Sequence, residues 1–320
     1  MNKVFSRKCY RLLLSPLVFG LLFTAPAESG VANPPPAVMK KIAPDLYFHF
    51  EYDSSNSIVW VTEEGVLIVD TRKHPRQGKD LVEKIRKITD KPIRWAVVTQ
   101  AHGDHYFGNQ VFKEQGATIV SQIETAPIME KDFDRGKRSL RGAFERYRLD
   151  PDEIILTLPD VTFEKQMNIN LGGKVVHLIY FGPAEDPGDS FVYFPHVKAL
   201  ATGGAYTTRH WTGLGQTPSV DGWIAVLRKI MQMDVDFFLP GHGDVGTKKD
   251  VQEAIGFLTD VQTGVKDAIA KGMNEEQTVK ALEFPQYMNW RAADNAPRQI
   301  SNLYHLLTTG KPVRVWPPAK

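Results

Sequence analysis

The sequence predicts an α+β protein in which two sheets pack face to face and helices cover their outer surfaces. Two stretches, 46–121 and 154–201, are rich in short β-leaning runs, and segments with helical spacing follow each of them. Because a sheet must bury its apolar face against another layer, this order favours paired sheets with helices outside. No linker rich in Pro or Gly separates the stretches, so we expect a single domain over residues 43–310, including the C-terminal helices.

The first strand-rich stretch consists of short apolar runs divided by turn residues such as Glu64-Gly65. Leu81, Ile85 and Ile88 have the spacing of one helix face and predict a helix over 74–88. The strands expected in this stretch are Leu46–Phe50, Ser57–Val61, Val66–Val69, 93–99 and 117–121.

Residues 125–150 differ from the rest, because they are dense in charge and carry regularly spaced apolar side chains. Phe133, Leu140, Phe144 and Tyr147 fall on one helix face. This pattern favours a helical insertion on the surface, and the alternative is a mobile lid over a site.

The second half again alternates strands and helices. The strands expected here are 154–158, Val161–Phe163, 174–181, 190–194, 199–201 and 237–239. The helices expected are 221–231, 251–271, Glu275–Ala281 and 302–307.

The N-terminus has the three parts of an export signal. Four cations between Lys3 and Arg11 precede the apolar residues 12–23, and residues 25–27 read Ala-Pro-Ala. We expect a signal peptide over 1–27, a linker over 28–42, and a mature protein in the periplasm or outside the cell, with no membrane span after cleavage. The alternative is an uncleaved anchor. Cys9 is the only cysteine, so the mature chain would have no disulfide and no thiolate.

The charge balance excludes some partners. The formal net charge is +2, too near zero to indicate nucleic acid binding. We therefore expect a small-molecule substrate, and the oligomeric state stays open.

The most informative run is Val97-Val98-Thr99-Gln100-Ala101-His102-Gly103-Asp104-His105. An apolar strand ends in a short loop that offers two imidazoles and a carboxylate within four residues. Nitrogen and oxygen donors of this kind bind divalent metals, and one tight turn can direct three of them to one point.

This run resembles the His-x-His-x-Asp-His signature of the metallo-β-lactamase superfamily, with Gln100 in place of the first His. Four further segments resemble the superfamily in order and spacing, and the likeness extends over roughly 43–246. These segments are 65–71, 182–190, 201–204 and 239–243. The resemblance implies a four-layer αββα sandwich with a metal site at one edge. Such sites usually hold two zinc ions and a bridging hydroxide that hydrolyses esters, lactones, amides, thioesters or phosphoesters.

The resemblance assigns two sets of ligand positions. The first metal site would be formed by Gln100, His102 and Glu185, where the family uses three His. The second would be formed by Asp104, His105 and His242, while Gly204 stands in place of a bridging carboxylate. The resemblance also gives Asp70 the part of a carboxylate that orients a ligand, with a turn cap as the alternative role.

The changed positions predict one divalent ion rather than two. Two imidazoles and a carboxylate suit zinc first, with iron or manganese as alternatives. Asp104 would orient the metal-bound water or hydroxide, or move its proton. His210 would protonate a leaving group or replace a lost ligand, and the alternative is an ordinary surface loop.

The predicted function is therefore an exported metal-dependent hydrolase with an atypical site, acting on an ester, lactone or amide-type bond. The alternative is a catalytically silent binding protein on the same fold. The sequence leaves the substrate open.

Overall fold

The computed structural model describes residues 37–313, all of which belong to one compact unit. The predicted signal peptide and most of the predicted linker lie outside the described residues. Among the described helices, none is long and apolar enough to cross a membrane.

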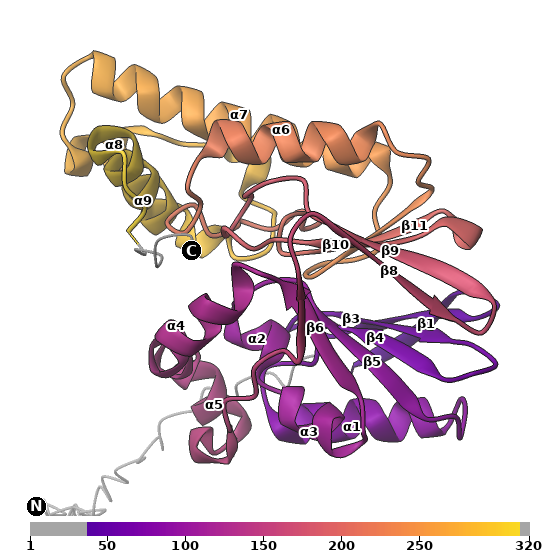
Figure 1. Cartoon of the computed structure of the whole chain (residues 1–320). Coiled ribbons are helices and arrows are strands. Elements are labelled where there is room, and N and C mark those ends of the chain that lie inside the picture. Colours follow the sequence, from indigo (N-terminus) through magenta and orange to yellow (C-terminus); the bar gives the residue numbers. More distant parts are fainter. Residues whose placement is uncertain (1–36, 314–320) are drawn as a thin grey trace, which may run out of the picture. The chain divides into compact units, whose positions relative to one another are not determined.

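Two sheets form the centre of the fold (Figure 1). The first has seven strands in the order β1 to β7, antiparallel from β1 to β4 and parallel from β4 to β7. Its strands are β1 Val38–Ala43, β2 Leu46–Phe50, β3 Ser57–Val61, β4 Val66–Val69, β5 Ile93–Val98, β6 Thr118–Gln122 and β7 Val161–Phe163. The second has five strands in the order β12-β11-β10-β9-β8. Its strands are β8 Gln166–Leu171, β9 Lys174–Ile179, β10 Phe191–Phe194, β11 Ala199–Gly203 and β12 Phe237–Pro240.

Helices cover the outer faces of both sheets. The helices are α1 Pro75–Arg86, α2 Gly103–Tyr106, α3 Asn109–Glu114, α4 Thr125–Ser139, α5 Arg141–Tyr147, α6 Val220–Met231, α7 Lys248–Ala270, α8 Glu275–Ala281 and α9 Ala296–Thr309. Short 3₁₀ turns are Pro151–Glu153, Pro195–Val197, Pro285–Tyr287 and Ala293–Asn295. In Figure 1, α1 and α3 lie below the first sheet, and α6 and α7 lie above the second.

Three hydrophobic clusters correspond to this layering. One contains Phe48 and Trp60 of the first sheet with Val176 and Val192 of the second, so it fills the space between the sheets. A second joins the first sheet to α1, α3 and α4, and a third joins the second sheet to α6, α7 and α9. The predicted α+β fold with an αββα sandwich is therefore confirmed.

Several predicted elements need correction. Residues 154–158, which follow the 3₁₀ turn Pro151–Glu153, do not form the predicted strand, although Ile154 is buried. Val38–Ala43, partly assigned to the linker, is an edge strand that pairs with β2. The helical insertion is confirmed but breaks at Leu140, so two helices form where one apolar stripe was expected. Strand β8 and helix α2 were not predicted, because they are short and partly polar.

The strand order places the ends of four strands close together. Asp70 follows β4 and Thr99 follows β5, which lie side by side in parallel. Gly204 follows β11 and Gly241 follows β12, another parallel pair. The amide of Gly241 donates to the carbonyl of Gly203 at 2.8 Å, so the two loops of the second sheet leave it together. Loops at such carboxyl ends are the usual location of binding sites in parallel sheets.

Candidate metal centre

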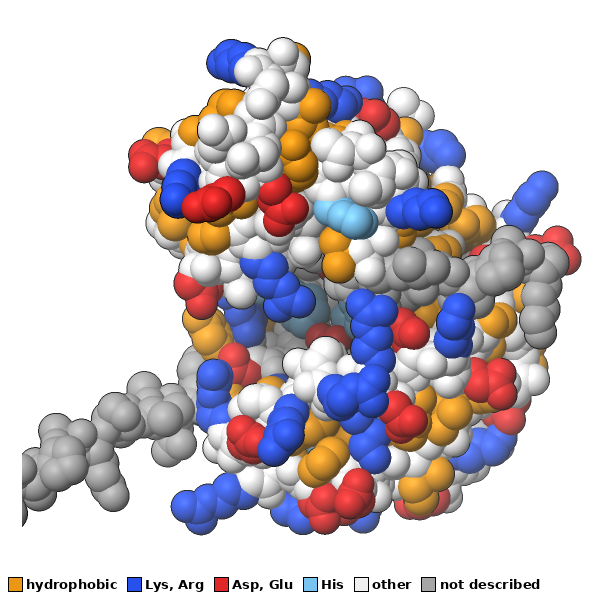
Figure 2. Space-filling view, turned by 90° about the vertical axis from the view of Figure 1, so that its left-hand side faces the viewer, with side chains coloured by type: hydrophobic (Ala, Val, Ile, Leu, Met, Phe, Trp, Pro, Cys, Tyr) orange, Lys and Arg blue, Asp and Glu red, His pale blue; other side chains and the backbone are white. Residues whose placement is uncertain are grey.

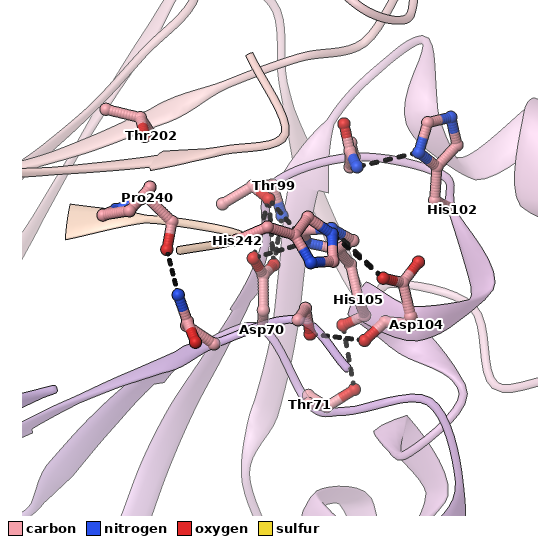
Figure 3. A network of polar contacts seen from close by, with 12 residues as sticks. Asp70, Thr71, Thr99, His102, Asp104, His105, Thr202, Pro240 and His242 are labelled. Carbon is pink, nitrogen blue, oxygen red and sulfur yellow. Dashed lines mark hydrogen bonds and ion pairs between the residues drawn. The ribbon is translucent and has the colours of Figure 1, made fainter. Parts of the chain in front are cut away.

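Three predicted ligands from two sheets meet at this edge. The Nε2 atom of His242 lies 3.1 Å from Oδ2 of Asp104, and Nε2 of His105 lies 3.9 Å from the same oxygen. One donor atom from each residue lies within 4.8 Å of the other two. Asp104 and His105 belong to α2, whereas His242 belongs to the loop after β12 (Figure 3).

The ring of His105 is held by its other nitrogen. Asp70 Oδ2 lies 2.7 Å from Nδ1 of His105, and Oδ1 of Asp70 accepts from the Thr99 amide at 2.9 Å. Asp70 itself has a positive φ of 62°, a conformation that few residues adopt without support from their surroundings. This arrangement fixes the tautomer of His105 and directs Nε2 toward Asp104 and His242. The predicted orienting contact of Asp70 is thus present.

The electrostatics of the three groups depend on one another. Burial opposes the charged form of Asp104, yet His105 and His242 hold its pKa well below the usual value. Burial likewise opposes the charge on His105, but Asp70 and Asp104 raise its pKa to about 9. Burial lowers the pKa of His242, against the attraction of Asp104. The donor set therefore contains an ionised carboxylate, which in the metal-free protein attracts a proton to the neighbouring imidazole.

This donor set fits a divalent metal. The Nε2 atom of His105 is buried and makes no hydrogen bond to any of the described residues. A buried ring nitrogen without a hydrogen-bond partner is costly, and a metal ion that replaced the proton on Nε2 would remove this cost. Two imidazoles and one carboxylate with an open position are typical of catalytic zinc and of non-haem iron. Asp104, His105 and His242 would hold the ion.

The other three predicted ligands lie together but are occupied with one another. The amide Nε2 of Gln100 lies 2.9 Å from Nδ1 of His102, and Glu185 Oε2 lies 3.7 Å from the same ring nitrogen. The remaining Gln100 oxygen is buried and has no hydrogen-bond partner within residues 37–313. The structure therefore brings Gln100, His102 and Glu185 into one cluster, in which a hydrogen bond joins Gln100 to His102.

The space beside Gly204 is occupied by side chains from two other loops. A Cβ built on Gly204 would overlap Oε2 of Glu185 and lie 2.5 Å from the amide atoms of Gln100. The space that a side chain at position 204 would fill is thus taken by Glu185 and Gln100. Glu185 brings a carboxylate from the β9–β10 loop next to the loop after β11.

Glu185 is held in a buried position. Its Oε1 accepts hydrogen bonds from the Thr212 hydroxyl at 3.2 Å and from the Gly213 amide at 3.1 Å. Burial raises the pKa of Glu185 to about 7, although the Gly213 amide and His105 favour the ionised form. At neutral pH the metal-free protein therefore holds Glu185 partly protonated.

Asp186 and Asp189 shape the loop beside this cluster. Oδ2 of Asp186 accepts from the Ala101 amide at 2.9 Å, and Oδ2 of Asp189 accepts from the Asp186 amide at 2.8 Å. These bonds connect the loop after β9 to the loop that carries His102. Asp189 thus shapes the loop through its bond to the Asp186 amide.

His210 lies directly against the metal centre. Its ring stacks on that of His242, with centroids 5.5 Å apart and planes inclined by 16°. Burial, with further contributions from His242 and Arg291, lowers the pKa of His210 to about 3. The ring is therefore neutral near pH 7, and it would donate a proton only as a neutral N–H. Its role in proton transfer stays a prediction.

Sequence reasoning missed the contribution of the 51–56 loop. The Ser55 hydroxyl donates to the Asp104 carbonyl at 2.5 Å, and Asn56 binds the loop that carries His242. Arg72, fully buried and with a φ of 84°, holds this loop through Glu51 and the Ser55 carbonyl. Polar residues just before a buried strand were the only signal, and that signal does not reveal partners nearly two hundred residues away.

Sequence reasoning also missed Arg291. Residues 209–211 pair with Arg291 through a short parallel bridge, which places this arginine beside His210. The guanidinium lies 4.1 Å from the ring centre of Tyr52 and 3.6 Å from Asp53. Asp53 also accepts from the Tyr147 hydroxyl of α5. Asp53 therefore touches both the helical insertion and the C-terminal segment.

The site opens to solvent through a cavity of about 340 Å³. His102 and Asp104 form part of its wall, together with residues of α4, of α9 and of the 213–216 loop. Figure 2 shows a hollow on this face, with histidine and acidic side chains at its floor and Lys and Arg side chains around it.

Comparison with known proteins agrees with this geometry. The family model of the Metallo-beta-lactamase superfamily matches residues 51–242, so the chain belongs to this family. It is 25% identical over 206 residues to the Metallo-beta-lactamase type 2 of Bacillus cereus, covering 63% of this chain and 72% of that protein. It is 24% identical over 263 residues to a Linear primary-alkylsulfatase of a Pseudomonas species, covering 70% of this chain and 49% of that protein.

Solved structures show the same fold. The Metallo-beta-lactamase from Pontibacter korlensis superposes with a TM-score of 0.57 at 19% identity, covering 70% of this chain and 99% of that one. The DIM-1 metallo-beta-lactamase gives a TM-score of 0.56 at 18% identity, covering 71% and 99%. At the level of the family, a hydrolase-like function and a divalent metal are supported.

Proposed function

We propose that this protein is an exported metal-dependent hydrolase that cleaves an ester, lactone or amide-type bond in a small molecule. The observation that carries the proposal is the convergence of Asp104, His105 and His242, with the Nε2 atom of His105 buried and without a hydrogen bond to any described residue. When bound there, a divalent cation lowers the pKa of water toward neutrality and polarises a carbonyl.

The protein's own residues position and orient the reacting groups. Asp70 fixes the His105 ring, and Ser55 fixes the backbone of Asp104. Asp104, whose pKa lies well below its usual value, would orient a nucleophilic water or accept its proton. The cavity beside Asp104 receives the substrate.

We propose that one ion is held tightly rather than two, and that it is zinc, with iron or manganese as alternatives. The hydrogen bond between Gln100 and His102 engages two of the three first-site positions, and Gly204 offers no side chain. A neutral amide is also a poorer donor to zinc than imidazole.

The alternative is a silent binding protein, and the closed cluster of Gln100, His102 and Glu185 is the observation that favours it. The relatives named above differ in what they act on: one is named for β-lactams and another for primary alkylsulfates. The substrate is therefore best sought with both bond types included.

Two measurements test the proposal. The first is elemental analysis of the mature protein, with Asp104→Ala and His242→Ala as site variants and His305→Ala, exposed on α9, as the matched control. We expect about one zinc per chain in the parent and control, and loss of metal in both site variants. The second is a screen of ester, lactone, β-lactam, thioester, phosphoester and alkylsulfate substrates. Metal retained by both site variants would refute the assigned ligands, and metal without turnover of any substrate would favour the silent alternative.

A further inference from the structure

The cavity next to Asp104 is bounded by elements that the metal centre itself does not need. One wall is the α4 part of the insertion, and the opposite wall is the first turn of α9. The 213–216 loop closes a third side. The residues that form the cavity are His102, Gly103, Asp104, Arg135, Gly136, Ser139, Leu140, Gly213, Gly215, Gln216, Asn295, Arg298, Gln299, Asn302 and Val313.

The charges of this cavity are unbalanced. Arg135 on α4 and Arg298 on α9 line opposite walls, and neither forms an ion pair with any residue between 37 and 313. The single carboxylate in the lining is Asp104, whose charge is directed to His242 and His105. A cation in the metal centre would cancel that negative charge and leave the cavity positive.

The remaining polar groups add to this preference. Asn295, which precedes α9, and Gln299 and Asn302 on its N-terminal half line the cavity with amides, so the positive end of the helix dipole lies beside it. Oε1 of Gln299 already accepts from the Leu214 amide at 2.9 Å, so its amide nitrogen is the part left to donate. The cavity thus supplies hydrogen-bond donors and positive charge, the features that recognise an oxyanion.

We propose that this cavity binds an anionic group of the substrate, a carboxylate, sulfate or phosphate monoester, between Arg135 and Arg298. The proposal rests on the proposed function, because it places this group next to the bond that the metal centre would cleave. The volume of about 340 Å³ corresponds to roughly ten water molecules, enough for a charged head group and a short chain.

A binding measurement tests this without requiring turnover. The probes are hexanoate, hexyl sulfate and hexyl phosphate, with hexanol as the neutral match, titrated into the zinc-loaded protein. The variants are Arg135→Gln and Arg298→Gln, and the control is Arg138→Gln on the same helix, which does not line this cavity. Both arginines are exposed, so their replacement should leave the fold intact, and circular dichroism checks this.

We expect at least one anion to bind and hexanol to bind much more weakly. Each site variant should weaken the affinity for the anion by about tenfold, or 1.4 kcal/mol, while Arg138→Gln should leave this affinity unchanged. The anion that binds most tightly indicates the class of the substrate's anionic group. Equal affinity in the parent and the Arg135→Gln/Arg298→Gln double variant would overturn the proposal, because an anion bound only to the metal does not depend on these arginines. If arginine-dependent binding persists while no substrate is hydrolysed, the proposed function fails and the anion site stands.

Discussion

Asn56 holds the loop of His242 from both sides. Its side-chain nitrogen donates to the carbonyls of Pro240 and Gly243, at 2.9 Å each, and its backbone amide donates to Gly241 at 2.7 Å. Figure 3 shows the bond to Pro240. A residue that contacts no substrate thus defines where one of the three metal donors lies.

Asn56→Ala should therefore weaken metal binding although every ligand remains. We expect metal affinity to fall by roughly tenfold or more, since residues that orient ligands typically contribute that much. Because the carbonyls of Pro240 and Gly243 lose their side-chain donor, the free energy of unfolding should also fall by about 1–3 kcal/mol. Competition with a chromophoric chelator measures the first effect and urea unfolding the second. Asn170→Ala, on the exposed side of β8, is the control, and equal affinity in both variants would contradict the role of Asn56.

Restoring the family ligands should raise the metal content. Gln100→His and Glu185→His with Gly204→Asp replace the hydrogen-bonded cluster with three donors, so zinc should rise from about one toward two per chain by elemental analysis. Gly204→Asp alone should behave differently, because its Cβ would overlap Glu185. We expect that single variant to lose roughly 1–3 kcal/mol of stability and to gain no metal. A triple variant with unchanged metal content would show that the loops no longer permit a second site.

Glu185 should make the metal-free protein less stable as pH rises. Burial raises its pKa from 4.5 to about 7, so the protonated form stabilises the fold fully below about pH 4.5, and this contribution is lost as pH rises through 7. The change amounts to on the order of 3 kcal/mol. Urea unfolding of the metal-free protein between pH 4.5 and 8 should show this slope in the parent and in Glu283→Gln, a surface control, but not in Glu185→Gln. Parallel curves for the parent and Glu185→Gln would show that Glu185 is not the titrating group.

Export should remove the first 27 residues. The basic head, apolar stretch and Ala-Pro-Ala run motivate cleavage after Ala27, so N-terminal sequencing of the exported protein should begin at or near Glu28. Ala25→Leu with Ala27→Leu should block cleavage and leave a longer chain, whereas Pro26→Ala should not. A protein that keeps Met1 and stays with the membrane would support the uncleaved anchor.

The fold was largely predictable, because buried strands and long amphipathic helices leave local patterns. Leu46–Phe50, Val66–Val69 and Glu275–Ala281 have the predicted bounds. Residues 154–158 were mistaken for a strand because four of the five are apolar, yet they pair with no strand in the described part of the chain. Sequence can show apolar periodicity but not the availability of a pairing partner.

The candidate site was predictable only where its residues share a short run. Asp104 and His105 were found from their spacing, and His242 from its resemblance to a family segment. Asn56 and Arg291 were not, since Asn56 binds Gly243, 187 residues away, and Arg291 pairs with His210, which is also distant in the sequence. The way Glu185 fills the space above Gly204 also depends on two loops from different strands.

The position of Asp53 couples two segments that are distant in the sequence. One carboxylate group receives the Tyr147 hydroxyl of α5 and faces the guanidinium of Arg291, so two segments distant in sequence meet at a single small anchor. Neither segment can swing outward alone without giving up a contact that the other also uses. One change at Asp53 would therefore remove a contact of the helical insertion and a contact of the C-terminal segment at the same time.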